Sequence, residues 1–345
     1  MRTVHDTLTV QSPRTATGIH QDLRHCRVGL LGCGTVGSAV VRGLAATEAA
    51  DVVAVAFRDP HLTRPRELGA ARRTTDAMEV VEDEDVDIVV EVMGGTEVAL
   101  EAIRSALRRG RPVVTANKAV VATHGPELAS LARQRGTALR YDAAVAGAVP
   151  ATGVVSDLAR VDRVVRIAGI LNGTANHVLT VAPQFGFDIA AAVEDAMRHG
   201  YAEADPSRDL DGTDTADKLV ILARLAWAHT HAWARSVTTA TVDRRGVESL
   251  TPEQLAATHD AGRVWRLVAE ATDDGHMHVA PVELPAHHEF ATVRGPRNVL
   301  EIEAAMAGRL TLIGEGAGGE ATASAVLRDL DALTRADGVK TLARR

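Results

Sequence analysis

The sequence has few cysteines and no long apolar run. Cys26 and Cys33 are its two cysteines, too few for the disulfide framework of a small secreted protein, and they suit reduced thiols in a cytoplasm. No apolar run reaches the roughly 18 residues of a membrane span. The first 25 residues lack the apolar centre of a signal peptide, and we expect Met1–His25 to be a polar, poorly ordered extension.

The chain also lacks a strong charge of either sign. A net charge of −7 gives no electrostatic reason to bind nucleic acid or an anionic membrane, so a small-molecule substrate is the better expectation. Aromatic residues make up 3% of the chain, which leaves Val, Leu, Ile and Ala to build the core. Because 345 residues exceed one ordinary core, we expect two domains.

Lysine is the scarcest charged residue. It occurs at Lys118, Lys218 and Lys340, so 35 of the 38 basic side chains are arginine. A desolvated lysine amine can lose its proton, whereas arginine stays charged, so lysines kept in such a chain are candidates for proton transfer. Lys340 fits a solvated tail. Lys118 and Lys218 lie in dense polar motifs, which favours chemistry over chance survival.

The pattern of apolar runs predicts an α/β fold with two domains. Residues 26–150 read as a Rossmann-type doubly wound parallel sheet that binds a dinucleotide. Residues 151–312 read as an α+β domain, and residues 313–345 as a C-terminal segment whose helix Ala321–Leu333 returns to the first domain. Strands are expected at Arg27–Leu31, Asp51–Ala56, Val86–Val92, Pro112–Thr115, Ala138–Tyr141, Val164–Leu171, Val237–Val242, His276–Val282 and Val299–Leu312. Helices are expected at Val98–Arg109, Pro126–Gln134, Ile189–His199 and Thr213–Ala228.

A glycine motif follows the first strand and opens the first helix. Gly32, Gly34 and Gly37 have the spacing of the dinucleotide fingerprint, for a tight turn, pyrophosphate approach and close helix packing. About 20 residues later, Arg58 favours the 2′-phosphate of NADP and Asp59 favours the ribose hydroxyls of NAD. Both cofactors stay open at this point.

A second polar element spans Gly200–Lys218. The spacing argues against a calcium loop, because an EF-hand loop needs a glycine at its sixth position and a closing glutamate at its twelfth, and this element does not have them there. If Thr213 begins a helix, Asp214 and Lys218 are four residues apart on one face, which is either a simple ion pair or a cationic acid held by a carboxylate. His276, His278, His287 and His288 lack a recognisable metal spacing and are interpreted as exposed.

Seven segments together resemble homoserine dehydrogenase, from about Arg27 to Leu330. They are Gly32–Gly37, Glu91–Thr96, Val113–Lys118, Tyr141–Gly147, Gly169–Asn176, Gly200–Lys218 and Gly314–Gly318. The resemblance implies NAD(P)H-dependent reduction of L-aspartate 4-semialdehyde to L-homoserine, in the branch leading to threonine and methionine. It also implies a homodimer formed through the second domain.

The same resemblance implies roles for individual residues. Lys218 would be the proton donor and Lys118 the second lysine at the reacting centre. Glu203, Asp209 and Asp214 would form the substrate site, with Glu203 on the substrate amino group. The cofactor would contact Gly32, Gly34, Thr35, Val36, Gly37, Arg58, Lys118 and Gly318.

A sodium ion is a further implication of the resemblance. Backbone carbonyls in a segment matching Asp142, Val145, Gly147 and Val149 would bind it. Asp142 replaces the usual glutamate and is one methylene shorter, which affects its side chain and not the carbonyls. His177 stands where an aromatic residue, often tyrosine, is common.

The C-terminal end and the choice of substrate leave further expectations. The chain stops soon after Leu333, so a regulatory ACT domain is not expected. Alternatives are a relative acting on another short amino-aldehyde or hydroxy acid, and a non-catalytic cofactor-binding protein. The joint presence of Lys118, Lys218, Glu203 and Asp214 argues against the second.

Overall fold

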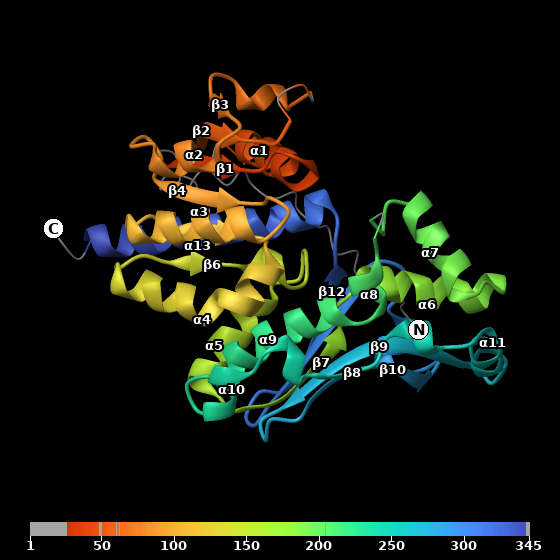
Figure 1. The fold of residues 1–345 in the computed structure, drawn as a ribbon. Coiled ribbons are helices and arrows are strands. Elements are labelled where there is room, and N and C mark those ends of the chain that lie inside the picture. Colours follow the sequence, from red (N-terminus) through yellow and green to blue (C-terminus); the bar gives the residue numbers. More distant parts are fainter. Residues whose placement is uncertain (1–25, 48–49, 60, 62, 204, 343–345) are drawn as a thin grey trace, which may run out of the picture.

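The protein folds into two lobes, each built around a six-stranded sheet (Figure 1). The structure, a computed structural model, describes residues 26–47, 50–59, 61, 63–203 and 205–342. The extension expected at Met1–His25 lies outside these residues. Within the described part, no helix has both the length and the apolarity that crossing a bilayer requires.

The first lobe is a parallel sheet with strand order β3-β2-β1-β4-β5-β6. Its valine-rich strands are buried from both faces, as in doubly wound sheets. Strand order reverses between β1 and β4, and doubly wound sheets bind their ligands at the carboxyl ends of the strands beside such a switch point. The strands are β1 Arg27–Leu31, β2 Asp51–Ala56, β3 Arg72–Thr74, β4 Ile88–Glu91, β5 Val113–Thr115 and β6 Leu139–Arg140.

Helices cover both faces of this sheet. One face carries α1 (Thr35–Thr47) together with α13 (Gly319–Leu342), and the other carries α2 (Ala77–Glu82), α3 (Glu97–Arg108) and α4 (Lys118–Gln134). The C-terminal helix α13 lies along α1, where Leu327 meets the open face of Gly43. The last helix of the chain therefore completes the core of the first lobe.

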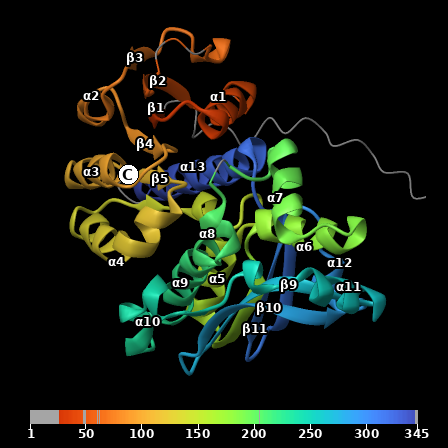
Figure 2. The same ribbon diagram turned by 45° about the vertical axis from the view of Figure 1, so that its right-hand side comes forward.

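The second lobe is a mixed sheet with strand order β12-β11-β7-β9-β10-β8. Its pairs are antiparallel except β10 with β8. The strands are β7 Val164–Ile170, β8 Asp243–Arg244, β9 Arg263–Thr272, β10 Met277–Pro285, β11 Arg297–Ala304 and β12 Gly308–Glu315. The helices are α5 Ala151–Val161, α6 Gly173–Phe185, α7 Ile189–Arg198, α8 Ser207–Leu210, α9 Thr213–Trp227, α10 Ala232–Ser236, α11 Pro252–Asp260 and α12 Glu289–Thr292 (Figure 2).

The expected fold class, a Rossmann-type sheet joined to an α+β domain, is confirmed. The domain boundaries at residues 150 and 312 stay a prediction. The strand expected at Val237–Val242 is wrong, because Thr239–Thr241 forms a 3₁₀ turn. The Thr241 side chain closes this turn by accepting a bond from the Thr238 N–H and donating to the Thr238 carbonyl.

The start of α4 also differs from expectation. The helix begins at Lys118, eight residues before the expected start at Pro126. Proline lacks the N–H that would bond the carbonyl four residues earlier. That carbonyl, on Ala122, instead accepts a hydrogen bond from Arg224 of α9 at 2.5 Å. A contact from the second lobe thus satisfies the group that the proline leaves free.

Candidate functional site

The glycine turn after β1 leaves open space at the N-terminus of α1. A Cβ on Gly32 would meet the Val92 carbonyl at 2.8 Å, and one on Gly37 would meet the Gly32 carbonyl at 2.1 Å. Nothing lies within 4 Å of a Cβ on Gly34. The first and third glycines therefore permit close packing, while the second leaves room over the helix N-terminus, the arrangement that a pyrophosphate requires.

Two glycines before α13 face the same turn. Gly318 has a φ of +102° and is exposed, with nothing within 4 Å of its Cβ position. A Cβ on Gly319 would lie 2.8 Å from the Thr35 side chain. At the start of α1, Thr35 is exposed and Val36 is half-buried. The residues expected at the cofactor thus come together from both ends of the chain.

An arginine that the sequence analysis did not select lies at the end of β2. Arg64 donates from Nη1 to the Cys33 carbonyl and from Nη2 to the Asp59 carbonyl, both at 2.8 Å. Its guanidinium stacks on the Phe57 ring at 4.8 Å. Arg58 is exposed, and the Asp59 carboxylate accepts the His61 N–H at 2.8 Å. The guanidinium of Arg64 is therefore fixed beside the glycine turn.

A buried acid lies at the carboxyl end of β4, opposite Leu31 at the end of β1. Glu91 ends β4, is fully buried, and accepts hydrogen bonds from the Thr115 hydroxyl and the Met93 N–H. Burial raises the pKa of Glu91 to about 7, against the lowering effect of these bonds. Thr115 also accepts the Asn117 N–H, and Asn117 caps α4 through the Val120 N–H. This chain of contacts fixes the first turn of α4, where Lys118 lies.

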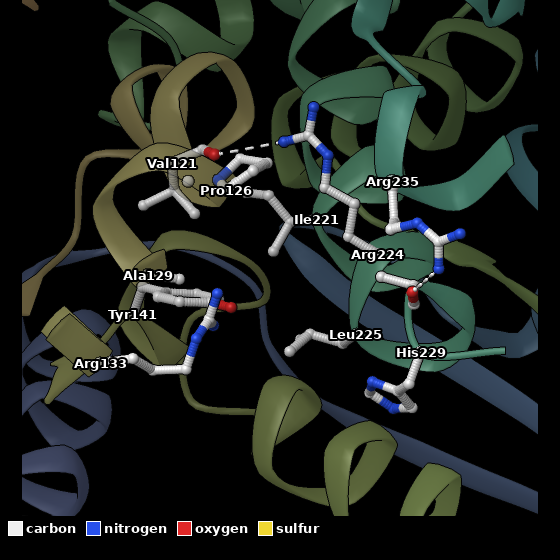
Figure 3. Close-up of a pocket in the computed structure, with 12 residues that line it drawn as sticks. Val121, Pro126, Ala129, Arg133, Tyr141, Ile221, Arg224, Leu225, His229 and Arg235 are labelled. Carbon is white, nitrogen blue, oxygen red and sulfur yellow. Dashed lines mark hydrogen bonds between the residues drawn. The ribbon is translucent and has the colours of Figure 1, made fainter. Parts of the chain in front are cut away.

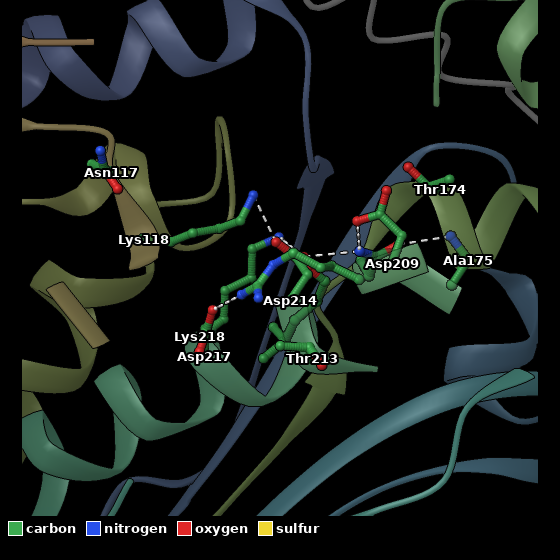
Figure 4. A network of polar contacts seen from close by, with 12 residues as sticks. Asn117, Lys118, Thr174, Ala175, Asp209, Thr213, Asp214, Asp217 and Lys218 are labelled. Carbon is green, nitrogen blue, oxygen red and sulfur yellow. Dashed lines mark hydrogen bonds and ion pairs between the residues drawn. The ribbon is translucent and has the colours of Figure 1, made fainter. Parts of the chain in front are cut away.

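The two lysines singled out from the sequence meet on one carboxylate. Lys118 comes from the first lobe, and its Nζ lies 2.7 Å from Oδ1 of Asp214. Lys218, one turn along α9 from Asp214, places its Nζ 2.8 Å from Oδ2. Figure 4 shows Lys118 reaching across the gap between the lobes toward Asp214. The Lys218 ammonium also donates to the Leu171 carbonyl at 2.7 Å.

Asn172 links this trio to another acid. Its Nδ2 donates to Asp209 at 2.7 Å and to Asp214 at 2.8 Å, while its Oδ1 caps α6 by accepting the Ala175 N–H. Asp209, on the short helix α8, and Asp214, on α9, are thereby held side by side. Sequence analysis gave Asn172 no role, although it lies in the Gly169–Asn176 motif.

Burial and charge separate the protonation behaviour of these groups. Burial alone raises the pKa of Asp214, but the ammonium groups of Lys218 and Lys118 hold it well below its usual range. The Asp214 charge in turn raises the pKa of Lys118. Burial and the Asp214 charge raise the pKa of Asp209. Asp214 is thus a permanent anion between two ammonium groups, a setting suited to stabilising a nascent alkoxide.

Glu203 is not part of this network. It is exposed and makes no ion pair within the described residues. The segment before it is anchored, because the Thr174 hydroxyl donates to the Tyr201 carbonyl at 2.6 Å. Thr174 lies two residues from Asn172, so Glu203 follows a point that is fixed close to the network.

The segment expected to bind sodium uses its carboxylate otherwise. Asp142 is buried, with Oδ1 accepting from the N–H and hydroxyl of Thr152 and Oδ2 accepting from Arg328 of α13 at 2.7 Å. The carbonyls of Asp142 and Val149 accept backbone bonds, whereas the structure gives those of Val145 and Gly147 none among the described residues. The side chain is therefore committed, while two carbonyls are available to a cation.

Further along α4 and α9 lies a cavity of about 380 Å³ (Figure 3). Arg224 borders it and ties the two helices by donating to the carbonyls of Val121, Ala122 and Val237. Because α4 begins with Lys118 and α9 carries Lys218, the hydrogen bonds from Arg224 to α4 constrain the spacing between the two lysines. The signal for Arg224 was the proline in α4, which frees one of the carbonyls that it binds.

Comparison with known proteins covers both lobes. Residues 32–142 match the family model described as the homoserine dehydrogenase NAD-binding domain, and residues 150–330 match that of homoserine dehydrogenase. A homoserine dehydrogenase of Mycobacterium tuberculosis (strain H37Rv) is 42% identical over 318 residues, covering 88% of this chain and 71% of the relative. One of Corynebacterium glutamicum is 40% identical over 322 residues, covering 88% and 70%.

Solved structures of similar fold are also homoserine dehydrogenases. A homoserine dehydrogenase from Thiobacillus denitrificans superposes with a TM-score of 0.81 at 33% identity, covering 91% of this chain and 74% of that one. A hyperthermophilic archaeal homoserine dehydrogenase in complex with NADPH gives a TM-score of 0.76 at 26% identity, covering 90% and 98%.

Proposed function

Since the chain belongs to the homoserine dehydrogenase family, we propose that Lys218 and Lys118 act at the reacting centre of the family reaction. That reaction is the reversible, NAD(P)H-dependent reduction of L-aspartate 4-semialdehyde to L-homoserine, a step of amino-acid biosynthesis. The observation that supports these roles is the meeting of two ammonium groups from different lobes on the buried carboxylate of Asp214.

The residues divide the chemistry between them. Bound NAD(P)H would supply a hydride for the aldehyde carbon, and negative charge would then develop on the aldehyde oxygen. Lys218 donates the proton that turns this oxygen into a hydroxyl, and Lys118 stabilises the charge from the opposite side. Asp214 raises the pKa of Lys118 and aligns both amines. Asp209 and Glu203 receive the substrate ammonium, Glu203 from the segment that follows Tyr201.

NADP is the proposed cofactor. Arg64 holds a guanidinium group beside the glycine turn, and the exposed Arg58 follows β2, a combination that suits a 2′-phosphate. Asp59, the residue that would favour NAD, has its carboxylate engaged by the His61 N–H. Gly34, Thr35, Val36 and Gly318 would border the pyrophosphate, with Lys118 at the nicotinamide end.

Three further proposals follow from the family and the geometry. A sodium ion would bind the carbonyls of Val145 and Gly147, without the Asp142 side chain, and its effect would appear as faster turnover in sodium than in a bulky organic cation. The chain would form a homodimer through the second lobe, whose β11–β12 hairpin exposes Met306 and Ile313. Light scattering, which measures the molar mass in solution, tests whether the chain is a dimer. The site of action would be the cytoplasm.

The decisive experiment measures initial rates of NADPH and NADH formation with L-homoserine, for the wild type and for Lys218→Ala. We expect turnover with NADP above that with NAD, and a loss of about 10²-fold or more in kcat for the variant. Cofactor binding without turnover in the wild type would refute the assignment. Full activity in Lys218→Ala would refute the role of that lysine.

A further inference from the structure

Two histidines and an aspartate converge outside the network described above. His177 lies on α6, Asp195 on α7, and His199 immediately follows α7. His177 Nε2 lies 3.0 Å from Asp195 Oδ2, and His199 Nδ1 lies 3.4 Å from the same oxygen. Asp195 and His199 are four residues apart and so share one helical face. Figure 2 shows α6 and α7 next to each other.

From this cluster we infer a binding site for a divalent first-row metal ion, with Zn²⁺ as the best match to two imidazoles and one carboxylate. The three ligand atoms lie within 4.8 Å of one another. A tetrahedral zinc ion with bonds of about 2.0–2.1 Å places its ligands about 3.3 Å apart. Two of the three separations already have this value within a few tenths of an ångström.

The remaining separation, between the two imidazoles, can close without disturbing the core. The His199 side chain is 56% exposed, whereas those of His177 and Asp195 are 10% and 15% exposed. The exposed ligand is therefore the one that moves onto a pair held by packing. Three protein ligands leave a fourth position for water, as in an open zinc site.

Two neighbouring contacts compete with metal binding. The His199 Nδ1–H donates to the Asp195 carbonyl at 2.9 Å, so the imidazole must give up this bond and its proton when it binds the ion. Arg198 pairs with Asp195 through the other carboxylate oxygen, Oδ1, at 3.0 Å, so Oδ2 stays available. Its guanidinium charge lowers the affinity for a cation, but the side chain is 67% exposed and can turn into solvent. The Tyr201 ring lies 4.9 Å from the His177 ring and 5.9 Å from the His199 ring, which limits the imidazole orientations.

A bound ion would join α6 to the end of α7. The chain then runs directly into Gly200 and Tyr201, the segment that precedes Glu203. The site is thus distinct from the lysine–aspartate network, and its metal binding does not depend on the proposed reaction.

The test is zinc titration of the full chain by calorimetry after treatment with a chelator. We expect one Zn²⁺ per chain at this site and an affinity at least tenfold lower in His199→Ala and in His177→Tyr, which restores an aromatic residue. His276→Ala is the matched control, because His276 pairs with Asp274 at 2.9 Å but has no third ligand among the residues that the structure describes. Zinc should raise the melting temperature of the wild type and of the control, and not of His199→Ala.

The variants rather than the wild type decide the outcome, because the chain contains 14 histidines. Absence of zinc binding in the wild type overturns the proposal. Equal binding in the wild type, His199→Ala and His177→Tyr also overturns it, since the ion then lies elsewhere. Circular dichroism of His199→Ala checks that this exposed substitution leaves the fold intact, and Co²⁺ absorption of the wild type reports the ligand geometry.

Discussion

Asp214→Asn removes the one charge that the ammonium groups of Lys118 and Lys218 share. The side chain keeps its shape, but Lys118 and Lys218 lose a carboxylate at 2.7 and 2.8 Å. Lys218 is 8% exposed and retains the Leu171 carbonyl as its partner. Removing one partner of a buried ion pair costs about 3–5 kcal/mol, because the remaining charge stays desolvated.

Most of this cost belongs to Lys218. The Lys118 side chain is 42% exposed, so water can solvate its ammonium, and pairs of that kind contribute about 1 kcal/mol or less. We therefore expect Asp214→Asn to lower the free energy of unfolding by about 3–5 kcal/mol and Lys118→Met by about 1 kcal/mol or less. In the Asp214→Asn background, Lys218→Met should restore much of the loss, because it removes the uncompensated charge.

The assay is urea unfolding at pH 7.5, followed by far-ultraviolet circular dichroism, with kcat measured on the same preparations. A turnover loss of about 10²-fold should accompany Asp214→Asn. The reasoning fails if Asp214→Asn stays within about 1 kcal/mol of the wild type. It also fails if Lys118→Met destabilises as much as Asp214→Asn, because burial would then not decide the cost.

Three further predictions concern other parts of the molecule. Glu91 has a pKa raised from 4.5 to about 7, so its neutral form favours the fold. The stability it contributes is complete below about pH 4.5 and falls by ~3 kcal/mol as pH rises through 7. Glu91→Gln should flatten this slope between pH 5 and 8 in urea unfolding, and an unchanged slope would contradict the assignment. Arg64→Ala should lower kcat/KM for NADP about tenfold and spare NAD, which parallel rates with both cofactors will show; equal losses would instead indicate general damage to the glycine turn. Arg224→Ala should lower kcat while leaving KM for the cofactor unchanged, with Arg235→Ala as control, because Arg235 binds the Ala228 carbonyl of its own lobe. An unchanged kcat would show that the Arg224 hydrogen bonds do not position the lysines.

Local patterns predicted the fold class and two local arrangements in the candidate site. The glycine spacing required a turn with close backbone approach, and the structure has it at Gly32 and Gly37. The four-residue spacing of Asp214 and Lys218 required one helical face, and the ion pair is present. Strand β9 was not predicted, because its alternation includes Arg266, which is buried and donates to the Ala291 carbonyl.

Contacts between distant segments could not be predicted in this way. Lys118 meets Asp214 only because two separately folded lobes face each other, and no local spacing encodes that meeting. Arg64 contacts the Cys33 carbonyl from the loop that follows β2, and no sequence spacing indicates this contact. His177 joins Asp195 only through the packing of α6 on α7, so spacing along the sequence could not indicate this pair.

Both lobes contribute to the site, so its geometry depends on the contacts between them. The first lobe supplies the cofactor turn and Lys118, and the second supplies Asp214 and Lys218. Arg224 bonds α4 to α9, and Asp142 accepts bonds both from Arg328 of α13 and from Thr152 of α5 in the second lobe. Because hydride and proton must reach adjacent atoms of one substrate, an error of about 1 Å between the lobes would cost turnover. In the proposed mechanism, arginines remote from the reacting atoms would therefore set the spacing at which the two lysines act.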